Sequence, residues 1–390
     1  MRLRALLLIE QAQTTTATAM PHWISQDTSK MTDEAYQAYS LQGVSRTFAL
    51  TIPQLPDRLR VQVGNAYLLC RITDTIEDEA VLTIDQKQAF ASEFVKVVKG
   101  EQSADTFATS LFNQLTDNTP EAERDLIRNT ARVVRLTHGF TLPQRRAIEH
   151  CVEEMATGMI RYQQQQSLDG LRDIKDLSDY CYYVAGVVGI MLTELFCEYS
   201  QEMAAHRDQM LELSVSFGQG LQMTNILKDI WEDQQRGACW LPRSVFASCS
   251  FEMKDLAQHR SDACYQDGLE ELIALASMHL ANALEYTLLV PAKEKGIRKF
   301  CFWALGMALL TLRKINRHRD FSCGQHVKIS RRQVKATVVA TRLVHGSNRR
   351  ARWLFDRVAR ELPQGPENST LTDPASASNK IEQYLSGSHK

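Results

Sequence analysis

The sequence contains no Cys-x-x-Cys pair and no His-Glu-x-x-His arrangement, so the common signatures of a zinc site are missing. Its nine cysteines are scattered, and an odd number without framework spacing favours reduced thiols in a cytosolic protein. Five of them have apolar neighbours and are expected to be small core residues: Cys70, Cys151, Cys181, Cys197 and Cys301.

Long hydrophobic runs are absent as well. The uncharged apolar stretches at residues 180–193 and 300–312 are shorter than the ~20 residues that cross a bilayer. The apolar run at residues 5–9 is too short for a secretory signal. A net charge of -1 gives no indication of nucleic-acid binding. We therefore expect a cytoplasmic monomer, soluble or peripheral to a membrane, without a transmembrane anchor.

No segment alternates apolar and polar residues over a useful length, so the sequence predicts an all-α protein. Residues 31–360 are expected to form one helical domain, between a disordered N-terminus (1–30) and a disordered tail (361–390) that are rich in small polar residues. Within it, periodic apolar residues predict long helices at 59–80, 86–99, 122–136, 142–165, 177–199, 210–234, 262–289 and 296–316.

A first polar stripe lies in the helix predicted at residues 59–80. Residues three and four apart share a helix face, which groups Tyr67, Arg71, Asp74 and Asp78. Glu77 lies three residues from Asp74 and belongs to the edge of the same stripe. Leu68, Leu69 and Ile72 give this helix a buried side.

A second polar stripe lies in the helix predicted at residues 210–234. Gln222, Asn225, Asp229 and Asp233 share one face, with Glu232 at its edge. Carboxylate and amide oxygens without a regular cationic partner are the ligands that Mg²⁺ uses, usually together with substrate phosphates. One such stripe is typical of a solvated helix face, and the presence of two favours a metal site.

Two carboxylate rows that face each other across a bundle repel, and Mg²⁺ relieves that repulsion. The resulting positive charge suits a diphosphate, for which Arg71 and the pair Ser45-Arg46 supply further donors. Apolar walls suit a hydrocarbon chain and exclude water. This design stabilises a diphosphate leaving group as it departs from an allylic chain.

The segment 313–360 is strongly basic, unlike the rest of the chain. It holds 14 Lys or Arg residues against Asp320 and Asp356, and the remainder of the chain is correspondingly acidic. Such a block is typical of a solvated face, a phosphate site or a surface that contacts an anionic membrane.

The two stripes resemble those of the squalene and phytoene synthases, the head-to-head prenyl transferases. The Asp-x-x-Glu-Asp and Gln-x-x-Asn-x-x-x-Asp-x-x-Glu-Asp motifs match in order, over about residues 40–340. Ser45-Arg46-Thr47-Phe48, the Tyr-Cys-Tyr-Tyr-Val-Ala-Gly segment from Tyr180 and the Arg-Gly-x-x-Trp-Leu-Pro segment at 236–242 match too. Phe300-Cys301 and Val327-Lys328-Ile329 resemble the squalene-forming branch in particular.

The resemblance implies a single-domain isoprenoid-synthase helical bundle with a central cavity. It implies Mg²⁺-dependent condensation of two farnesyl diphosphates through presqualene diphosphate, followed by reduction to squalene with NADPH, in sterol or hopanoid biosynthesis. Lys228 stands where eukaryotic relatives usually have Arg, which removes a bidentate phosphate contact.

The same resemblance implies roles for individual residues. Tyr180 is expected to assist proton loss during cyclopropyl formation, with Tyr67 and Arg71 beside the reacting diphosphate. Lys328 and Arg331 are expected at the NADPH phosphates. The implied metal ligands are Asp74, Glu77, Asp78, Asn225, Asp229, Glu232 and Asp233, and the implied substrate contacts are Ser45, Arg46, Phe48, Arg71, Gln222, Lys228, Phe300 and Cys301.

Three alternatives stay open at this point. In the first alternative, the chain is a head-to-head synthase that acts without reductant and forms dehydrosqualene or phytoene. A chain-elongating synthase or a terpene cyclase also carries aspartate-rich helices, although the Tyr180 segment disfavours both. A family member that binds prenyl lipids without catalysis is disfavoured by the intact carboxylates of both stripes.

Overall fold

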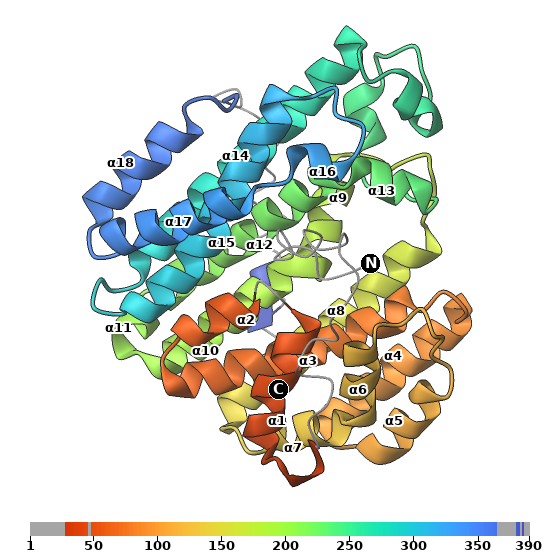
Figure 1. Ribbon diagram of the computed structural model, residues 1–390, viewed down its shortest axis with the longest axis vertical. Coiled ribbons are helices and arrows are strands. Elements are labelled where there is room, and N and C mark those ends of the chain that lie inside the picture. The colour runs from red at the N-terminus through yellow and green to blue at the C-terminus, as the bar shows by residue number, and fades with distance from the viewer. Residues whose placement is uncertain (1–27, 46–47, 365–379, 383, 386–390) are drawn as a thin grey trace. The chain divides into compact units, whose positions relative to one another are not determined.

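The computed structural model describes residues 28–45, 48–364, 380–382 and 384–385, and these residues are almost entirely helical (Figure 1). Their one β feature is an isolated parallel bridge between Leu171 and Pro242. The predicted all-α class is therefore confirmed. The chain divides into two compact units, Met1–Gln164 with Glu194–Gln201 and Gln165–Thr193 with Glu202–Lys390. The single domain predicted for residues 31–360 stays a prediction.

The first unit is built from short N-terminal helices and a longer helical core. Its helices are η3 (Thr28–Lys30), α1 (Asp33–Val44), α2 (Phe48–Thr51), η4 (Ile52–Gln54), α3 (Asp57–Asp78), α4 (Ile84–Lys99), α5 (Ala104–Phe112), α6 (Glu121–Arg128), α7 (Thr130–His138) and α8 (Leu142–Gln164). Helix α3 packs against α1, α4, α6, α7 and α8, and residues 62–77 of it are buried without interruption.

The second unit contains the longest helix of the described chain, α14. Its elements are α9 (Ile174–Cys181), the π-helical turn η5 (Tyr182–Gly186), α10 (Val187–Tyr199, ending in the first unit), α11 (Gln201–Ala204), α12 (Arg207–Lys228), α13 (Ile230–Gln235), η6 (Arg243–Phe246), η7 (Met253–Gln258), α14 (Ala263–Leu289), α15 (Lys295–Arg317), α16 (Gly324–Val327), α17 (Arg331–Val344) and α18 (Asn348–Ala359). Helix α12 packs against η5, α14 and α15, and it is buried along most of its length.

For two of the predicted helices, the prediction of one continuous helix is wrong. The helix expected at 122–136 is interrupted at Asn129, which separates α6 from α7. The helix expected at 210–234 is interrupted at Asp229, whose φ of -102° and ψ of 15° end α12 and begin α13. Asn and Asp compete for backbone hydrogen bonds and favour helix ends, which accounts for both positions.

Backbone contact between helices depends on two glycines in the second unit. A Cβ on Gly218 would lie 2.3 Å from the Ala185 carbonyl oxygen, and one on Gly189 would lie 2.3 Å from the Ser214 carbonyl oxygen. Gly189, in the helix predicted at residues 177–199, therefore serves close helix packing. The contact brings α12 against η5 and α10.

A buried polar cluster joins α12 to α14. Asn282 Nδ2 donates to Ser216 Oγ at 2.9 Å, and Ser216 Oγ lies 2.7 Å from His279 Nδ1. Because Ser216 already accepts from Asn282, its hydroxyl is oriented to donate to the imidazole. Burial lowers the pKa of His279 from 6.5 to about 4, which keeps the ring neutral.

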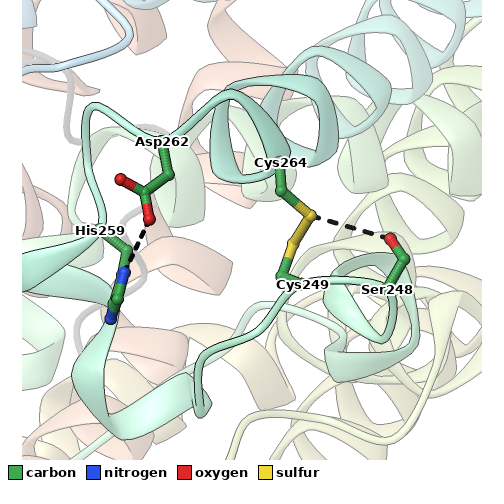
Figure 2. Close-up of a disulfide and its surroundings, with 5 residues drawn as sticks. All are labelled: Ser248, Cys249, His259, Asp262 and Cys264. Atoms are coloured by element: carbon green, nitrogen blue, oxygen red, sulfur yellow. Dashed lines mark hydrogen bonds and ion pairs between the residues drawn. A yellow bond between two sulfur atoms is a disulfide. The ribbon is translucent and has the colours of Figure 1, made fainter.

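Cys249 and Cys264 form a disulfide, which corrects the expectation that all the thiols are reduced. Figure 2 shows the bond beside the His259–Asp262 contact of 2.7 Å in the turn before α14. The two cysteines are 15 residues apart, and the folded turn brings them together, so spacing alone did not indicate the pair. The five predicted core cysteines are all free and buried, as expected.

The termini are described only in part. Residues 1–27 and 365–379, where disorder is predicted, lie outside the described residues. Thr28–Lys30 form a short 3-10 turn. Near the C-terminus, Ile381 is buried against Tyr182 and Val215, a contact that the composition of the tail did not predict.

Among the residues that the structure describes, two helical stretches are long and apolar enough to cross a membrane, Ile174–Tyr199 and Ala263–Leu289. Their most apolar windows are 72% and 67% buried. Burial inside the helical units accounts for their composition, because a core helix is apolar nearly all round.

Candidate active site

The first stripe lies on α3, on a face that is almost completely buried. Arg71 Nη2 donates to Tyr67 Oη at 2.9 Å, and Arg71 Nη1 lies 3.8 Å from Asp74 Oδ2. The Arg71 and Asp74 side chains are each 1% exposed, whereas Asp78 at the helix end is exposed. The structure therefore brings Tyr67, Arg71 and Asp74 into one chain of contacts, in the order that their spacing predicts.

Glu123, which the sequence interpretation did not single out, belongs to the same cluster. Its Oε1 lies 3.8 Å from Arg71 Nη1, and its Oε2 accepts from Thr75 Oγ1 at 3.4 Å. Arg71 thus stands between Asp74 of its own helix and Glu123 of α6. A guanidinium held between two carboxylates is fixed in orientation.

The C-terminal end of α3 is anchored through the main chain of Glu77. Its carbonyl oxygen accepts from Lys87 Nζ of α4 and from Gln163 Nε2 of α8, the latter at 3.1 Å. Burial raises the pKa of the Glu77 carboxyl to about 7. Lys87 and Gln163 are positioning residues that the sequence interpretation missed, because only the tertiary fold brings them to α3.

Ser45 and Phe48 lie beside Tyr67 in the first unit. The Phe48 backbone N–H donates to Ser45 Oγ at 3.0 Å, and the Phe48 and Tyr67 rings are 4.4 Å apart between centroids. Tyr67 Oη in turn donates to the Val44 carbonyl oxygen at 3.3 Å. The predicted substrate residues Ser45 and Phe48 therefore adjoin the first stripe, whereas Arg46 lies outside the described residues.

The second stripe continues across the break between α12 and α13. The Asp229 N–H donates to the Asn225 carbonyl oxygen, and the Asp233 N–H donates to the Asp229 carbonyl oxygen, both at 2.9 Å. These two bonds keep helical spacing through the break, so the predicted face is retained. Gln222 is 3% exposed, and Lys228 Nζ lies 3.2 Å from Asp229 Oδ2.

A glycine brings α16 against this second stripe. The Gly324 N–H donates to Glu232 Oε1 at 2.8 Å. A Cβ on Gly324 would lie 2.9 Å from the Lys228 carbonyl oxygen and 3.2 Å from Asp229 Oδ1. The segment that leads to the predicted cofactor residues Lys328 and Arg331 therefore starts at the second stripe.

Tyr180 is buried and stacks on Trp240, with ring centroids 4.5 Å apart and planes inclined by 2°. Trp240 is held by pairing between two loop segments. The Cys239 N–H donates to the Ser167 carbonyl oxygen, and the Leu171 N–H donates to the Leu241 carbonyl oxygen, at 2.9 and 3.0 Å. The Trp-Leu-Pro motif thus supplies a flat support for the predicted catalytic tyrosine.

Phe300 and Cys301 are buried on α15, 5% and 2% exposed. Burial raises the pKa of the Cys301 thiol to about 12, which makes it an apolar core residue rather than a nucleophile. Lys328 follows α16, and Arg331 opens α17 on the solvent side.

The oxygen donors of the two stripes suit Mg²⁺. Within the part of the chain that the structure describes, no three His, Cys, Asp or Glu side chains form a closed metal-binding group. Among the same residues, the buried Gln222 Oε1 and Glu232 Oε2 have no hydrogen-bond partner. Mg²⁺ typically takes one or two carboxylates and completes its octahedron with waters and phosphates. Open carboxylate stripes fit that kind of site better than a closed cage would.

A family profile and the individual relatives of this chain indicate the same family. The family profile described as squalene/phytoene synthase matches residues 41–333. Squalene synthase of Schizosaccharomyces pombe is 31% identical over 285 residues. That alignment covers 72% of this chain and 59% of the relative, so the chain spans less than two thirds of the relative's length.

Two solved structures share the fold. TcSQS in complex with BPH1237 superposes with a TM-score of 0.69 at 20% identity, covering 91% of this chain and 99% of that chain. A dehydrosqualene synthase in complex with a ligand gives a TM-score of 0.58 at 21% identity, covering 80% and 95%. At these identities the likeness concerns the fold.

Proposed function

Since this chain belongs to the squalene/phytoene synthase family, we propose that it is a farnesyl-diphosphate farnesyltransferase of the squalene synthase type. It joins two molecules of farnesyl diphosphate head to head into presqualene diphosphate, and then reduces that intermediate to squalene with NADPH. The burial of Asp74 and Asp229, each on its own acidic helix face, is the observation that carries the proposal. Carboxylates are buried in such rows where a cation joins them.

We propose that each stripe binds a diphosphate through Mg²⁺. On the first stripe, Asp74 and Asp78, supported by Glu77, would hold the metal. On the second stripe, Asn225, Asp229 and Asp233, supported by Glu232, would hold it. When bound, the metal neutralises the diphosphate and stabilises it as a leaving group.

Arg71 is suited to orient the diphosphate. Its contacts with Tyr67, Asp74 and Glu123 fix the guanidinium in a buried position. A fixed cation that meets developing negative charge requires little reorganisation as the carbon–oxygen bond breaks. Ser45 and Arg46 are proposed as further donors to the diphosphate of the first stripe. Lys228 and Gln222 are proposed as donors to the diphosphate of the second stripe.

Tyr180 is suited to guide the proton lost when the cyclopropane ring closes. Stacking on Trp240 holds the phenol ring in one plane, so its hydroxyl is directed rather than free to turn. The hydroxyl hydrogen-bonds the departing proton's acceptor, which we take to be a diphosphate oxygen. The apolar side chains Phe300 and Cys301 protect the cationic chain from water.

The reductive step is assigned to the side of the second stripe. The contact of Gly324 with Glu232 supports this, because it brings α16 and the adjoining Lys328 to the acidic residues. Lys328 and Arg331 then bind the phosphates of NADPH, which supplies the hydride when bound. Dehydrosqualene or phytoene, formed without reductant, is the alternative product.

The test is incubation of the purified chain with farnesyl diphosphate and Mg²⁺, with and without NADPH, followed by mass analysis of the hydrocarbon. The proposal expects presqualene diphosphate without NADPH and squalene with it. Dehydrosqualene in both reactions would replace the reductive function with the alternative. A head-to-tail product or no release of diphosphate would contradict the proposal as a whole.

A further inference from the structure

The last two helices, α17 and α18, form a strongly basic layer. Residues 331–360 contain nine Lys or Arg residues and a single acidic residue, Asp356. The two helices pack against each other and lie side by side in Figure 1. Such a concentration of one sign raises the local potential and attracts an anionic partner.

The outer faces of both helices also carry large apolar side chains. Val339, Leu343 and Trp353 are 56%, 68% and 63% exposed. On α18, helical spacing puts Arg349 and Arg350 within one turn of Trp353. A face that mixes exposed Trp and Leu with Arg is typical of helices that lie in a membrane interface, where the rings enter the headgroup region and the cations meet phosphates.

Helix α18 covers an apolar cavity rather than a packed core. Ala351 is its one buried residue among those described, while Leu354, Phe355 and Val358 are half-buried and line a cavity of about 220 Å³. Gly306 and Leu309 of α15 line the other side, and the cavity is partly open to solvent. Its apolar lining suits a hydrocarbon chain, and the opening gives such a chain a way in.

The turn between α17 and α18 adds a fixed basic corner. Burial lowers the pKa of His345, and the charges of Lys299, Lys295 and Arg298 lower it further. Arg298 is held by the carbonyl oxygens of Val290 and His345, at 2.7 and 2.9 Å, which fixes its charge in place.

We propose that α17 and α18 dock this chain on an anionic lipid bilayer, with the cavity beneath α18 receiving one lipid hydrocarbon chain. The basic residues supply charge complementarity to the anionic lipid headgroups. Each basic side chain near such a surface changes the binding constant by about tenfold at most. A nucleic acid or an acidic protein would use the charges, but neither would fill a hydrocarbon-lined cavity. The proposal is independent of prenyl transfer, because docking requires no turnover.

The first experiment is flotation of the full chain with vesicles of phosphatidylcholine alone and with vesicles containing a third of phosphatidylglycerol. Binding is expected on the anionic vesicles and is expected to fall as salt increases. The variant Arg349→Glu with Arg350→Glu should bind at least tenfold more weakly, and Trp353→Ser should weaken binding at all salt concentrations. Circular dichroism checks that each variant is folded.

A matched control reverses two exposed cations on the first unit, Arg58→Glu with Arg146→Glu. It makes the same change in net charge and should bind as the unchanged chain does. Equal loss in both pairs would show that overall charge governs binding, and would overturn the assignment to α17 and α18. Equal flotation on neutral and anionic vesicles would overturn the proposal too, as would tighter binding to duplex nucleic acid than to the anionic vesicles.

The second experiment locates the lipid. Phosphatidylglycerol with a diazirine in its acyl chain is incorporated into the vesicles and activated, and labelled peptides are identified by mass spectrometry. Labels are expected within residues 331–358 and on the cavity wall of α15. Ala340→Phe, which narrows the cavity, should reduce labelling of the α15 wall while flotation persists. Labelling confined to other segments would contradict the proposal.

Discussion

The phenol ring of Tyr180 lies parallel to the indole ring of Trp240, inclined by 2° with centroids 4.5 Å apart. The two residues lie about sixty positions apart in the sequence, and each belongs to a different motif of the family resemblance. The loop that carries Trp240 is itself held by the Ser167 and Leu171 backbone. Tyr180, the proposed catalytic tyrosine, and the segment that ends the second stripe therefore form one structural assembly, in which Trp240 would be a positioning residue.

Replacing Trp240 tests that role. Aromatic pairs contribute about 0.5–1.5 kcal/mol beyond buried area. Trp240→Leu should slow presqualene diphosphate formation by roughly two- to twelvefold, whereas Trp240→Phe, which keeps an aromatic face, should lose less. Single-turnover kinetics of the first half-reaction is the measurement. Equal losses in both variants would indicate that Trp240 fills space only.

Removal of the Tyr180 hydroxyl should affect one half-reaction more than the other. Tyr180→Phe keeps the stacked ring, and we expect it to slow formation of presqualene diphosphate by about 100-fold or more, as loss of a proton-transfer group does. Reduction of supplied presqualene diphosphate should change much less. An unchanged first half-reaction in single turnover would contradict the assigned role, and Tyr183→Phe, three positions along the chain from the stacked ring, is the matched control.

Each acidic stripe should be essential for turnover and dispensable for folding. Asp74→Asn and Asp229→Asn keep shape and remove charge, so we expect activity to fall roughly 100-fold or more with little change in melting temperature. Asp57→Asn on α3 and Asp208→Asn on α12 alter exposed carboxylates of the same helices and should retain activity. Near-normal turnover in either stripe variant would eliminate the two-stripe hypothesis.

The contact at Gly324 predicts a selective defect in reduction. Gly324→Ala places a Cβ within 2.9 Å of the Lys228 carbonyl oxygen, which must displace α16 from the second stripe. We expect a several-fold higher KM for NADPH and release of presqualene diphosphate. Gly346→Ala, whose Cβ would meet nothing within 4 Å, is the control. An unaltered KM for NADPH would separate this segment from the cofactor.

Stability should fall with acidity through His279. Its pKa of about 4 lies below the ordinary 6.5, so the unfolded chain binds a proton first as pH decreases. The free energy of unfolding should therefore decrease between pH 6.5 and 4, by about 3 kcal/mol at the most. Urea titrations of the unchanged chain and of His279→Gln measure it. A similar slope in both would contradict this origin, and His206→Gln, at an exposed histidine, should keep the full slope.

Helical spacing was sufficient to predict which polar residues share a face. Tyr67, Arg71 and Asp74 are joined on α3 as their intervals of four and three require. The break at Asp229 was missed because the apolar period continues through it, and the i to i+4 bonds on both sides preserve the face. Periodicity reports which direction a side chain points and is insensitive to a single kinked residue.

Partners from distant segments could not be predicted in the same way. Glu123 reaches Arg71 from α6, and Lys87 reaches Glu77 from α4, because of how the helices pack. A lone Glu or Lys in an amphipathic helix has no local feature that distinguishes it from a solvated charge. The Cys249–Cys264 pair was missed for the same reason, since the turn that joins the two thiols is a property of the folded chain.

Gly189 and Gly218 set a limit on how the second unit can vary. Neither has a functional group, yet each faces a carbonyl oxygen at a distance that no side chain tolerates. A saturation screen for lost activity would rank both positions with the acidic residues. Essential positions in such a screen would then have two different causes. At the stripes the reactive side chain is required, and where α12 crosses η5 and α10 the absence of a side chain is required.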